Sequence, residues 1–216
     1  MRNNIISHNL GVKKRPLIVV VFIALVLIAA MALDTEVIKN GSSEELRKQV
    51  FSPDSYAQAE YPKIKDYVLS KAVDAQTFFS DFQTDSEAAV SRYGVKSGIG
   101  SIVPISFEGE VEAGTSGIYS VQVPGIPNNQ TIRVNTGPVI NGTALRDATG
   151  ELKFDQFKNQ IEYQNIGSAL NRVMITEILS NLDQDTLVGK IVHVTGVFRL
   201  LNPQNWLVTP VRFNVE

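Results

Sequence analysis

Seventeen consecutive apolar residues, from Leu17 to Leu33, set the limits for any fold of this chain. As an α-helix this run would measure about 25 Å, close to the roughly 30 Å hydrocarbon core of a bilayer. Three basic residues, 13–15, precede the run, and the acidic Asp34 and Glu36 follow it. Because basic flanks stay in the cytoplasm, this order predicts a cytoplasmic amino end and an extracytoplasmic remainder.

Two outcomes are open for this segment. Ala30-Met31-Ala32 resembles the small-x-small site at which signal peptides are cleaved, whereas the length of the run favours an uncleaved signal anchor. A core helix is disfavoured because the run has no polar face. The sequence contains no cysteine, so no thiol is present to carry a lipid. We therefore expect a single-pass membrane protein whose carboxyl-terminal domain lies outside the cytoplasm.

The region after the anchor is predicted to be helical. Apolar residues recur at helical spacing over residues 55–69, where Pro62 interrupts the pattern, and again over residues 71–82. The second helix carries three phenylalanines that would lie exposed on a solvated stalk, so we expect them to pack against the main domain. The predicted regions are a cytoplasmic basic tail (1–16), a transmembrane signal anchor (17–33), a helical membrane-proximal region (34–100) and a barrel domain (101–216).

From Ser101 onward the hydrophobic period changes to that of a strand. Phe107 and Val111 alternate with acidic residues, which predicts one buried and one solvated face. Further alternation predicts strands over residues 118–123, 131–145, 190–200 and 206–215, and a long helix over residues 154–182. Pro138 is expected to bend the third strand, and Gly196 to let the fourth coil. Three strands, a helix and two strands is the order of an OB-fold barrel of the α+β class, with a sandwich or another small barrel as alternatives.

Arg146 and Asp147, where the third strand leads into the helix, are the first candidates for a ligand site. Neighbours on a strand point to opposite faces, so we expect that the two do not bind each other. In one interpretation Arg146 clamps an anion or a sugar hydroxyl, and Asp147 accepts a hydrogen bond from the ligand. In the other, which we favour, Asp147 accepts from backbone amides in a turn and Arg146 pairs with Glu162.

The long helix carries an unusual set of polar side chains: Asn159, Gln160, Glu162, Tyr163 and Asn171. Asn159 and Tyr163 share a face at helical spacing. Amides, a carboxylate and an aromatic ring suit the hydroxyls and the ring of a sugar. The same groups could instead fix the helix to strand edges through hydrogen bonds to the backbone. Both interpretations predict a partly buried amide network.

Five segments carry a resemblance to a known family: residues 137–148 (GPVINGTALRDA), 154–163, 169–171, 189–198 and 209–211. They resemble a bacterial family of predicted periplasmic lipoproteins of unknown function, from roughly Phe51 to the carboxyl end. The resemblance implies an OB-like fold. Since genes of this family often lie beside sugar ABC-transporter components, it also implies a transport-linked role in the cell envelope. The resemblance also implies a periplasmic location. This chain lacks the cysteine that carries the lipid in that family, which leaves residues 17–33 as the expected anchor in the inner (plasma) membrane.

Other function classes receive little support from the sequence. The net charge of −2 does not favour a nucleic-acid partner. Glu108, Glu110 and Glu112 are expected to form a solvated face, because a row of like charges repels without converging on a metal ion. No nucleophile elbow is present, which disfavours a hydrolase. No catalytic residue, metal site or cofactor is predicted.

The expected function is therefore that of a non-enzymatic accessory or binding module associated with a sugar ABC transporter. A stand-alone module that binds a small molecule or an oligosaccharide is the alternative. The candidate ligand-binding residues are Arg146, Asp147, Asn159, Gln160, Glu162, Tyr163 and Asn171.

Overall fold

The computed structural model describes residues 14–34 and 51–216, which belong to two compact units, Met1–Val50 and Phe51–Glu216. In the first unit, helix α1 covers Lys14–Asp34. No helix among the described residues meets the combined requirements of length and apolarity for crossing a bilayer. Most of the predicted basic tail, up to residue 13, and the first part of the predicted membrane-proximal region, residues 35–50, lie outside the described residues.

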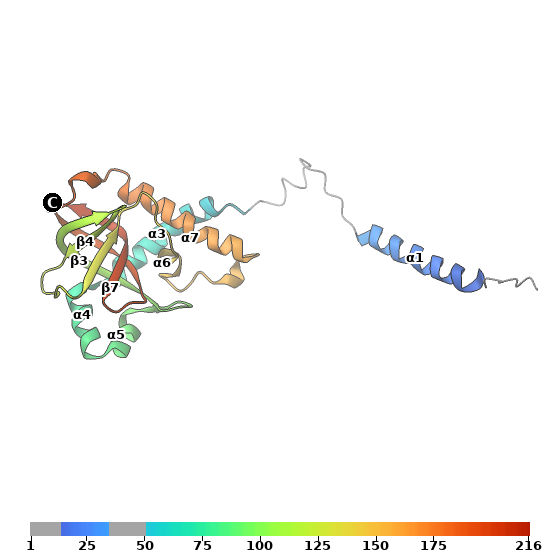
Figure 1. The fold of residues 1–216 in the computed structure, drawn as a ribbon, viewed down its shortest axis with the longest axis horizontal. Helices are drawn as coiled ribbons and strands as arrows, with labels where there is room; N and C mark the ends of the chain where they lie inside the picture. Colours follow the sequence, from blue (N-terminus) through green and yellow to red (C-terminus); the bar gives the residue numbers. More distant parts are fainter. Residues whose placement is uncertain (1–13, 35–50) are drawn as a thin grey trace, which may run out of the picture. The chain divides into compact units, whose positions relative to one another are not determined.

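The second unit is organised around a closed ring of five strands (Figure 1). In the order of their pairing these are β3 (Ser101–Thr115), β4 (Ile118–Gln122), β5 (Thr131–Asn135), β7 (Asn205–Val215) and β6 (Ile191–Leu200). The ring closes because β3 also pairs with β6, from Ser101↔Leu200 to Glu110↔Ile191. The β5–β7 pair is parallel, and the other pairs of the ring are antiparallel. The predicted number and order of the main strands are therefore confirmed.

Strand β3 has the two faces that its alternation predicts. Phe107 and Val111 are buried, whereas the glutamates between and after them, at 108, 110 and 112, are exposed. On β6, a side chain at Gly196 would bring its Cβ within 2.4 Å of the Thr209 carbonyl oxygen. The β6–β7 register shifts at this glycine, so the strands coil there as expected.

The third strand is shorter than predicted, because β5 ends at Asn135 instead of continuing to residue 145. Thr136 turns away from the ladder and donates to the Gly117 carbonyl oxygen through both its backbone N–H (2.7 Å) and its hydroxyl (3.0 Å). The next residue, Gly137, has a φ of +87°, which does not belong to a strand. The chain then forms a short helix, α6, over Ala144–Asp147.

The long helix begins later than predicted. Helix α7 covers Gln160–Met174 and continues as a wider π-helical turn, η2 (Ile175–Leu179). Asn159 caps it, since its side chain accepts a hydrogen bond from the Glu162 N–H at 2.9 Å. The expected start at Phe154 is wrong because Phe154–Gln156 forms a separate 3-10 turn, η1, ahead of this cap.

The region before the ring consists of three helices and two short strands. These are α3 (Pro53–Lys71), β1 (Val73–Asp74), α4 (Ala75–Thr84), α5 (Ser86–Tyr93) and β2 (Val95–Lys96). Helix α3 passes through Pro62 without the expected interruption, because Tyr61 and Ile64 on either side are fully buried. Both short strands pair with β3, β1 in parallel and β2 in antiparallel direction, and so tie the helices to the ring.

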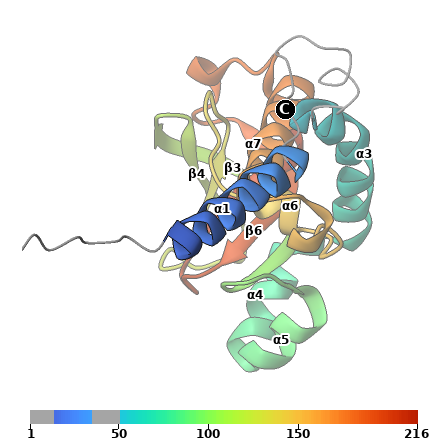
Figure 2. The ribbon, with the colours of Figure 1, turned by 90° about the vertical axis from the view of Figure 1, so that its right-hand side faces the viewer.

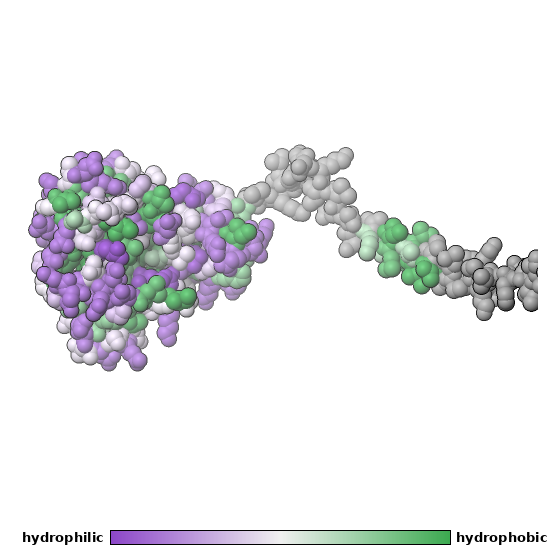
Figure 3. All heavy atoms as spheres, viewed as in Figure 1, coloured by the Kyte–Doolittle hydropathy of each residue, from purple (hydrophilic) through white to green (hydrophobic). Residues whose placement is uncertain are grey.

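Two hydrophobic cores hold this unit together. In the first, Phe78 of α4 packs edge-on against Phe198 and Trp206 of the ring, with ring centroids 5.8 and 5.2 Å apart. The expectation that the phenylalanines of α4 pack against the main domain is therefore confirmed. In the second, α3 and α7 bury Tyr61, Leu170 and other residues against β6 and β7. Figure 2 shows α3 and α7 next to each other, with α4 and α5 at the other end of the ring, and Figure 3 shows a largely hydrophilic surface over this unit.

Candidate functional site

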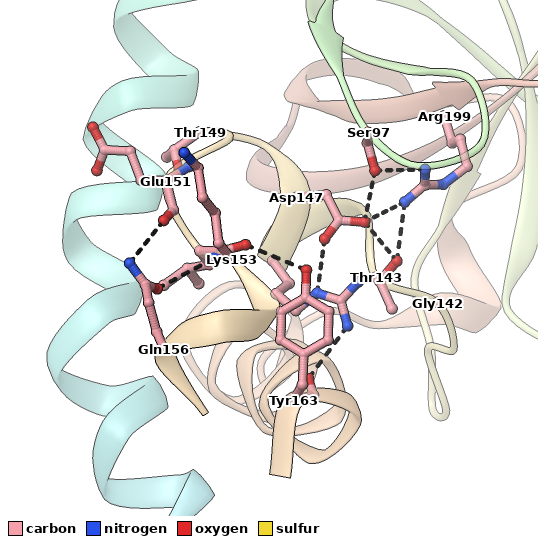
Figure 4. Close-up of polar contacts among 12 residues, drawn as sticks. Ser97, Gly142, Thr143, Asp147, Thr149, Glu151, Lys153, Gln156, Tyr163 and Arg199 are labelled. Atoms are coloured by element: carbon pink, nitrogen blue, oxygen red, sulfur yellow. Dashed lines mark hydrogen bonds and ion pairs between the residues drawn. The ribbon is translucent and has the colours of Figure 1, made fainter. Parts of the chain in front are cut away.

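Asp147 lies at the centre of a polar cluster that joins α6, the β2–β3 loop and β6 (Figure 4). Its side chain is 7% exposed. One carboxylate oxygen, Oδ2, accepts hydrogen bonds from the hydroxyls of Ser97 and Thr143, both at 2.9 Å, and from Nη2 of Arg199 at 2.5 Å. The other, Oδ1, accepts from Nε of Arg146 at 2.7 Å. Both oxygens are thus occupied by side-chain donors.

The direct contact between Arg146 and Asp147 corrects the expectation that these neighbours do not bind each other. That expectation assumed a strand, whereas both residues lie on helix α6, which brings their side chains together. The favoured interpretation expected Asp147 to accept hydrogen bonds from backbone amides. In the structure its carboxylate accepts from side chains instead. Arg146 does not pair with Glu162 either, because the Glu162 carboxylate accepts from the Lys158 N–H instead.

The two guanidinium groups determine the charge state of Asp147. Burial is the largest single influence and would raise the pKa of its carboxyl group, but the hydrogen bond and the charge of Arg146, together with the hydrogen bonds from Arg199 and Thr143, outweigh burial. The pKa of Asp147 therefore lies below its ordinary value, and the side chain is an anion at neutral pH.

The guanidinium group of Arg199 donates four hydrogen bonds. Its Nη1 donates to the Ser97 hydroxyl at 2.9 Å and to the Ile99 carbonyl oxygen at 2.8 Å, and its Nη2 donates to Thr143 and Asp147. Arg146 in turn lies over the ring of Tyr163, with 3.7 Å from its guanidinium carbon to the ring centroid. It also donates to the Tyr163 carbonyl oxygen at 3.2 Å. The cluster therefore fixes α6 to β6 and to the first turns of α7.

A hollow of about 300 Å³ opens next to this cluster. The residues with polar or aromatic side chains that line it are Lys96, Ser97, Asp147, Lys153, Phe154 and Tyr163. Phe154 is 50% exposed and packs edge-on against Tyr163, with ring centroids 5.8 Å apart. The hollow therefore has two aromatic residues, two lysines and the buried aspartate in its lining, around a space that fits a small molecule.

The structure brings only part of the predicted set together. Asp147 and Tyr163 line the hollow, and Arg146 contacts both of them. Asn159 serves as the helix cap, and Gln160 is exposed and makes no side-chain hydrogen bond with another described residue. The predicted amide network is therefore not formed by this end of the helix.

Asn171 has a structural role. It is 3% exposed, and its Nδ2 donates to the carbonyl oxygens of Ile140 and Gly142, both at 3.0 Å. These bonds hold the loop between β5 and α6 against α7. Asn171 thus links the helix to the backbone as one interpretation expected, but to a loop and not to a strand edge, and both N–H groups of its amide are in use.

Sequence reasoning missed Arg199, Ser97, Lys96 and Lys153. A signal for Arg199 was present, since it is the charged residue within the otherwise apolar β6 sequence from Val197 to Leu200, where an arginine needs a partner. No comparable signal marks the other three, which lie in loops or at an element end. Among the described residues, no group of three or more histidine, aspartate and glutamate side chains is arranged to hold a metal ion.

Comparison with known proteins agrees with this architecture. The chain is similar to an OB-fold protein from Thermotoga maritima whose crystal structure is known, with a TM-score of 0.62 and 19% sequence identity over 78% of this chain and 100% of that one. This likeness shows an OB fold. No curated protein matches the sequence. The family model for "predicted periplasmic lipoprotein (DUF2291)" matches residues 21–214. The chain therefore belongs to this family of predicted periplasmic lipoproteins, whose function is unknown.

Proposed function

We propose that this protein is a membrane-anchored extracytoplasmic module that binds a small polar molecule in the hollow beside Asp147 and works with a sugar ABC transporter. The observation that carries the binding role is the hollow of about 300 Å³, with two aromatic rings and a fully bonded charged cluster in its wall. Its volume is at the lower end of the roughly 300–1,000 Å³ typical of ligand pockets. The ligand is therefore about the size of a monosaccharide.

The arrangement favours binding over catalysis. A general base is most effective when its pKa lies near the working pH, whereas the pKa of Asp147 is lowered by its two arginines. Both of its oxygens are engaged by Arg146, Arg199 and two hydroxyls, so the carboxylate is a fixed structural anion. Such a rigid wall is suited to hold a ligand in one orientation.

The anchoring half of the proposal rests on the apolar run of residues 17–33, on the basic residues before it and on the family's periplasmic assignment. Because the sequence has no cysteine, we propose that this segment takes the place of a lipid. A reporter enzyme that is active only outside the cytoplasm, fused after Glu216, should be active. Activity of a fluorescent reporter that matures only in the cytoplasm would contradict this topology.

The binding role can be tested with the purified full-length chain in a detergent without a sugar headgroup. Calorimetric titration with a panel of neutral and acidic monosaccharides should identify a ligand. Replacing Phe154 with alanine should weaken binding roughly 2- to 10-fold, because a ring in contact with the ligand is lost. The matched control is Ile161→Ala, since Ile161 is also an exposed apolar residue (69%) but does not line the hollow. No binding by any sugar, or equal loss in both variants, would contradict the proposed site.

The transporter partner distinguishes this proposal from a stand-alone binding module. The tagged full-length chain, retrieved from gently solubilised membranes, should bring with it the permease and solute-binding subunits of a sugar ABC transporter. Recovery of the chain alone, from a preparation that still binds its ligand, would instead favour a stand-alone receptor.

A further inference from the structure

The donors and acceptors of the hollow beside Asp147 are strongly unbalanced. Oδ1 of Asp147 accepts from Arg146, and Oδ2 accepts from Arg199 and from the Ser97 and Thr143 hydroxyls. Ser97 uses its hydroxyl hydrogen in that bond. A neutral sugar needs acceptors for its hydroxyl hydrogens as well as donors for its oxygens. The side-chain acceptors that Asp147 and Ser97 place in this wall are already in use, since the Ser97 hydroxyl oxygen also accepts from Nη1 of Arg199.

The free groups of the hollow are cationic donors. Lys96 and Lys153 line it from opposite segments, β2 and the loop before η1, and neither forms an ion pair with another described residue. Each ammonium group offers three N–H donors and no acceptor. The one carboxylate in the wall is balanced by two guanidinium groups, so it does not cancel the charge of the lysines.

We propose that the ligand of this hollow carries an anionic group, a carboxylate or a phosphate, which Lys96 and Lys153 bind together while Tyr163 and Phe154 contact its ring. This inference rests on the proposed binding function and specifies its ligand class, an acidic sugar or a ligand of the same chemistry. An anion supplies only acceptors, which is what a wall of free donors requires. The rings supply the apolar contact that a sugar face needs.

The test compares ligands that share one sugar ring and differ in the group at C6, which is neutral in the parent sugar and anionic in its acidic relatives. Glucose, glucuronate and glucose 6-phosphate, and the corresponding galactose series, are titrated into the full-length chain in a non-sugar detergent. We expect an acidic member to bind at least tenfold more tightly than its neutral parent, and its affinity to fall as the ionic strength rises. Whether the uronate or the phosphate binds more tightly identifies which anion the site takes.

Two variants test the role of the lysines. The double variant Lys96→Gln, Lys153→Gln should lose roughly tenfold in affinity for the acidic ligand, because two charge-assisted hydrogen bonds are lost. Lys158→Gln is the matched control, since Lys158 is also an exposed lysine near this segment but does not line the hollow. Both substituted lysines are exposed, so an unchanged melting temperature should confirm that the variant is folded.

The outcomes separate this inference from the function on which it rests. If the neutral parent binds as tightly as its acidic partner, or if the double variant binds the acid as well as the wild type does, the anionic assignment is overturned and the binding function stands. If no member of either series binds, both are overturned. Selective binding of an acid that is lost in the double variant and kept in Lys158→Gln supports both.

Discussion

Nη2 of Arg199 donates a hydrogen bond of 2.5 Å to Oδ2 of Asp147, which joins a strand of the ring to helix α6 across 52 residues of sequence. The two side chains are 20% and 7% exposed, respectively. Arg199 and Arg146 together hold the carboxylate of Asp147, which lines the hollow. The energetic role of the Arg199–Asp147 pair can be measured directly.

Replacing Arg199 with methionine should lower the free energy of unfolding by about 2–4 kcal/mol. The reason is that Asp147 keeps its charge in a buried position but loses one of its two cationic partners. Denaturant unfolding of the full-length chain, followed through the fluorescence of its single tryptophan, Trp206, measures this loss. Arg212→Met on the neighbouring strand β7 is the control, because Arg212 is exposed and should cost less than about 0.5 kcal/mol. Equal losses in the two variants would show that the pair contributes nothing specific.

The stability that Asp147 provides should depend on pH. Its pKa in the folded protein lies below the ordinary value of 3.8, so the ionised carboxylate stabilises the fold above that pH. This contribution is lost as the pH falls through the lowered pKa. The difference in unfolding free energy between the wild type and Asp147→Asn should therefore be largest near neutral pH and shrink below about pH 4. Unfolding curves measured at a series of pH values test this, and a difference that stays constant down to pH 2 would contradict it.

Asn171 should be important for stability and not for binding. Asn171→Ala leaves the carbonyl oxygens of Ile140, which is buried, and Gly142 without their shared donor, which should cost about 1–3 kcal/mol. Hydrogen exchange in the β5–α6 loop should become faster. Asn165→Ala serves as the control on the same helix, because Asn165 is exposed. If the alanine at 171 weakens ligand binding without lowering stability, the structural role assigned to this amide is wrong.

The turn at Gly117 should not tolerate a side chain. A Cβ there would come within 1.3 Å of the Gly137 carbonyl oxygen, and the backbone has a φ of +73°. We expect Gly117→Ala to destabilise the protein by roughly 4 kcal/mol or more. Gly189→Ala separates the cost of the positive φ from the cost of the close contact. Gly189 also has a positive φ (+80°), but a Cβ there would have no atom within 4 Å. This substitution should cost only about 1 kcal/mol. Similar melting temperatures for the two variants would argue against the close contact.

Local periodicity was enough to predict the strands of the ring. The alternation around Phe107 and Val111 and the glycine at 196 within an apolar strand depend on nearest neighbours, and the structure agrees with both. The path from Thr136 to Asp147 was not predictable in this way. It is set by Gly117 on one side and by Asn171 on the other, which lie far away in sequence.

The candidate site likewise depends on a contact between residues far apart in sequence, which local patterns do not predict. Arg146 and Asp147 were singled out as a charged pair ahead of the long helix and Tyr163 as part of a polar set on that helix, and the structure places the three together. Arg199 could not be joined to them, because only the closure of the ring brings β6 next to α6. A pattern read along the chain contains no information about that contact.

The pairing of β3 with β6 has a further consequence. Each of the five strands of the ring pairs with a neighbour on both sides over part of its length, so among the described residues no strand of the ring has a completely open flank to which a strand from another protein could be added. Addition of a strand to this ring would have to displace part of the existing pairing, which favours contacts through side chains on helices and loops instead.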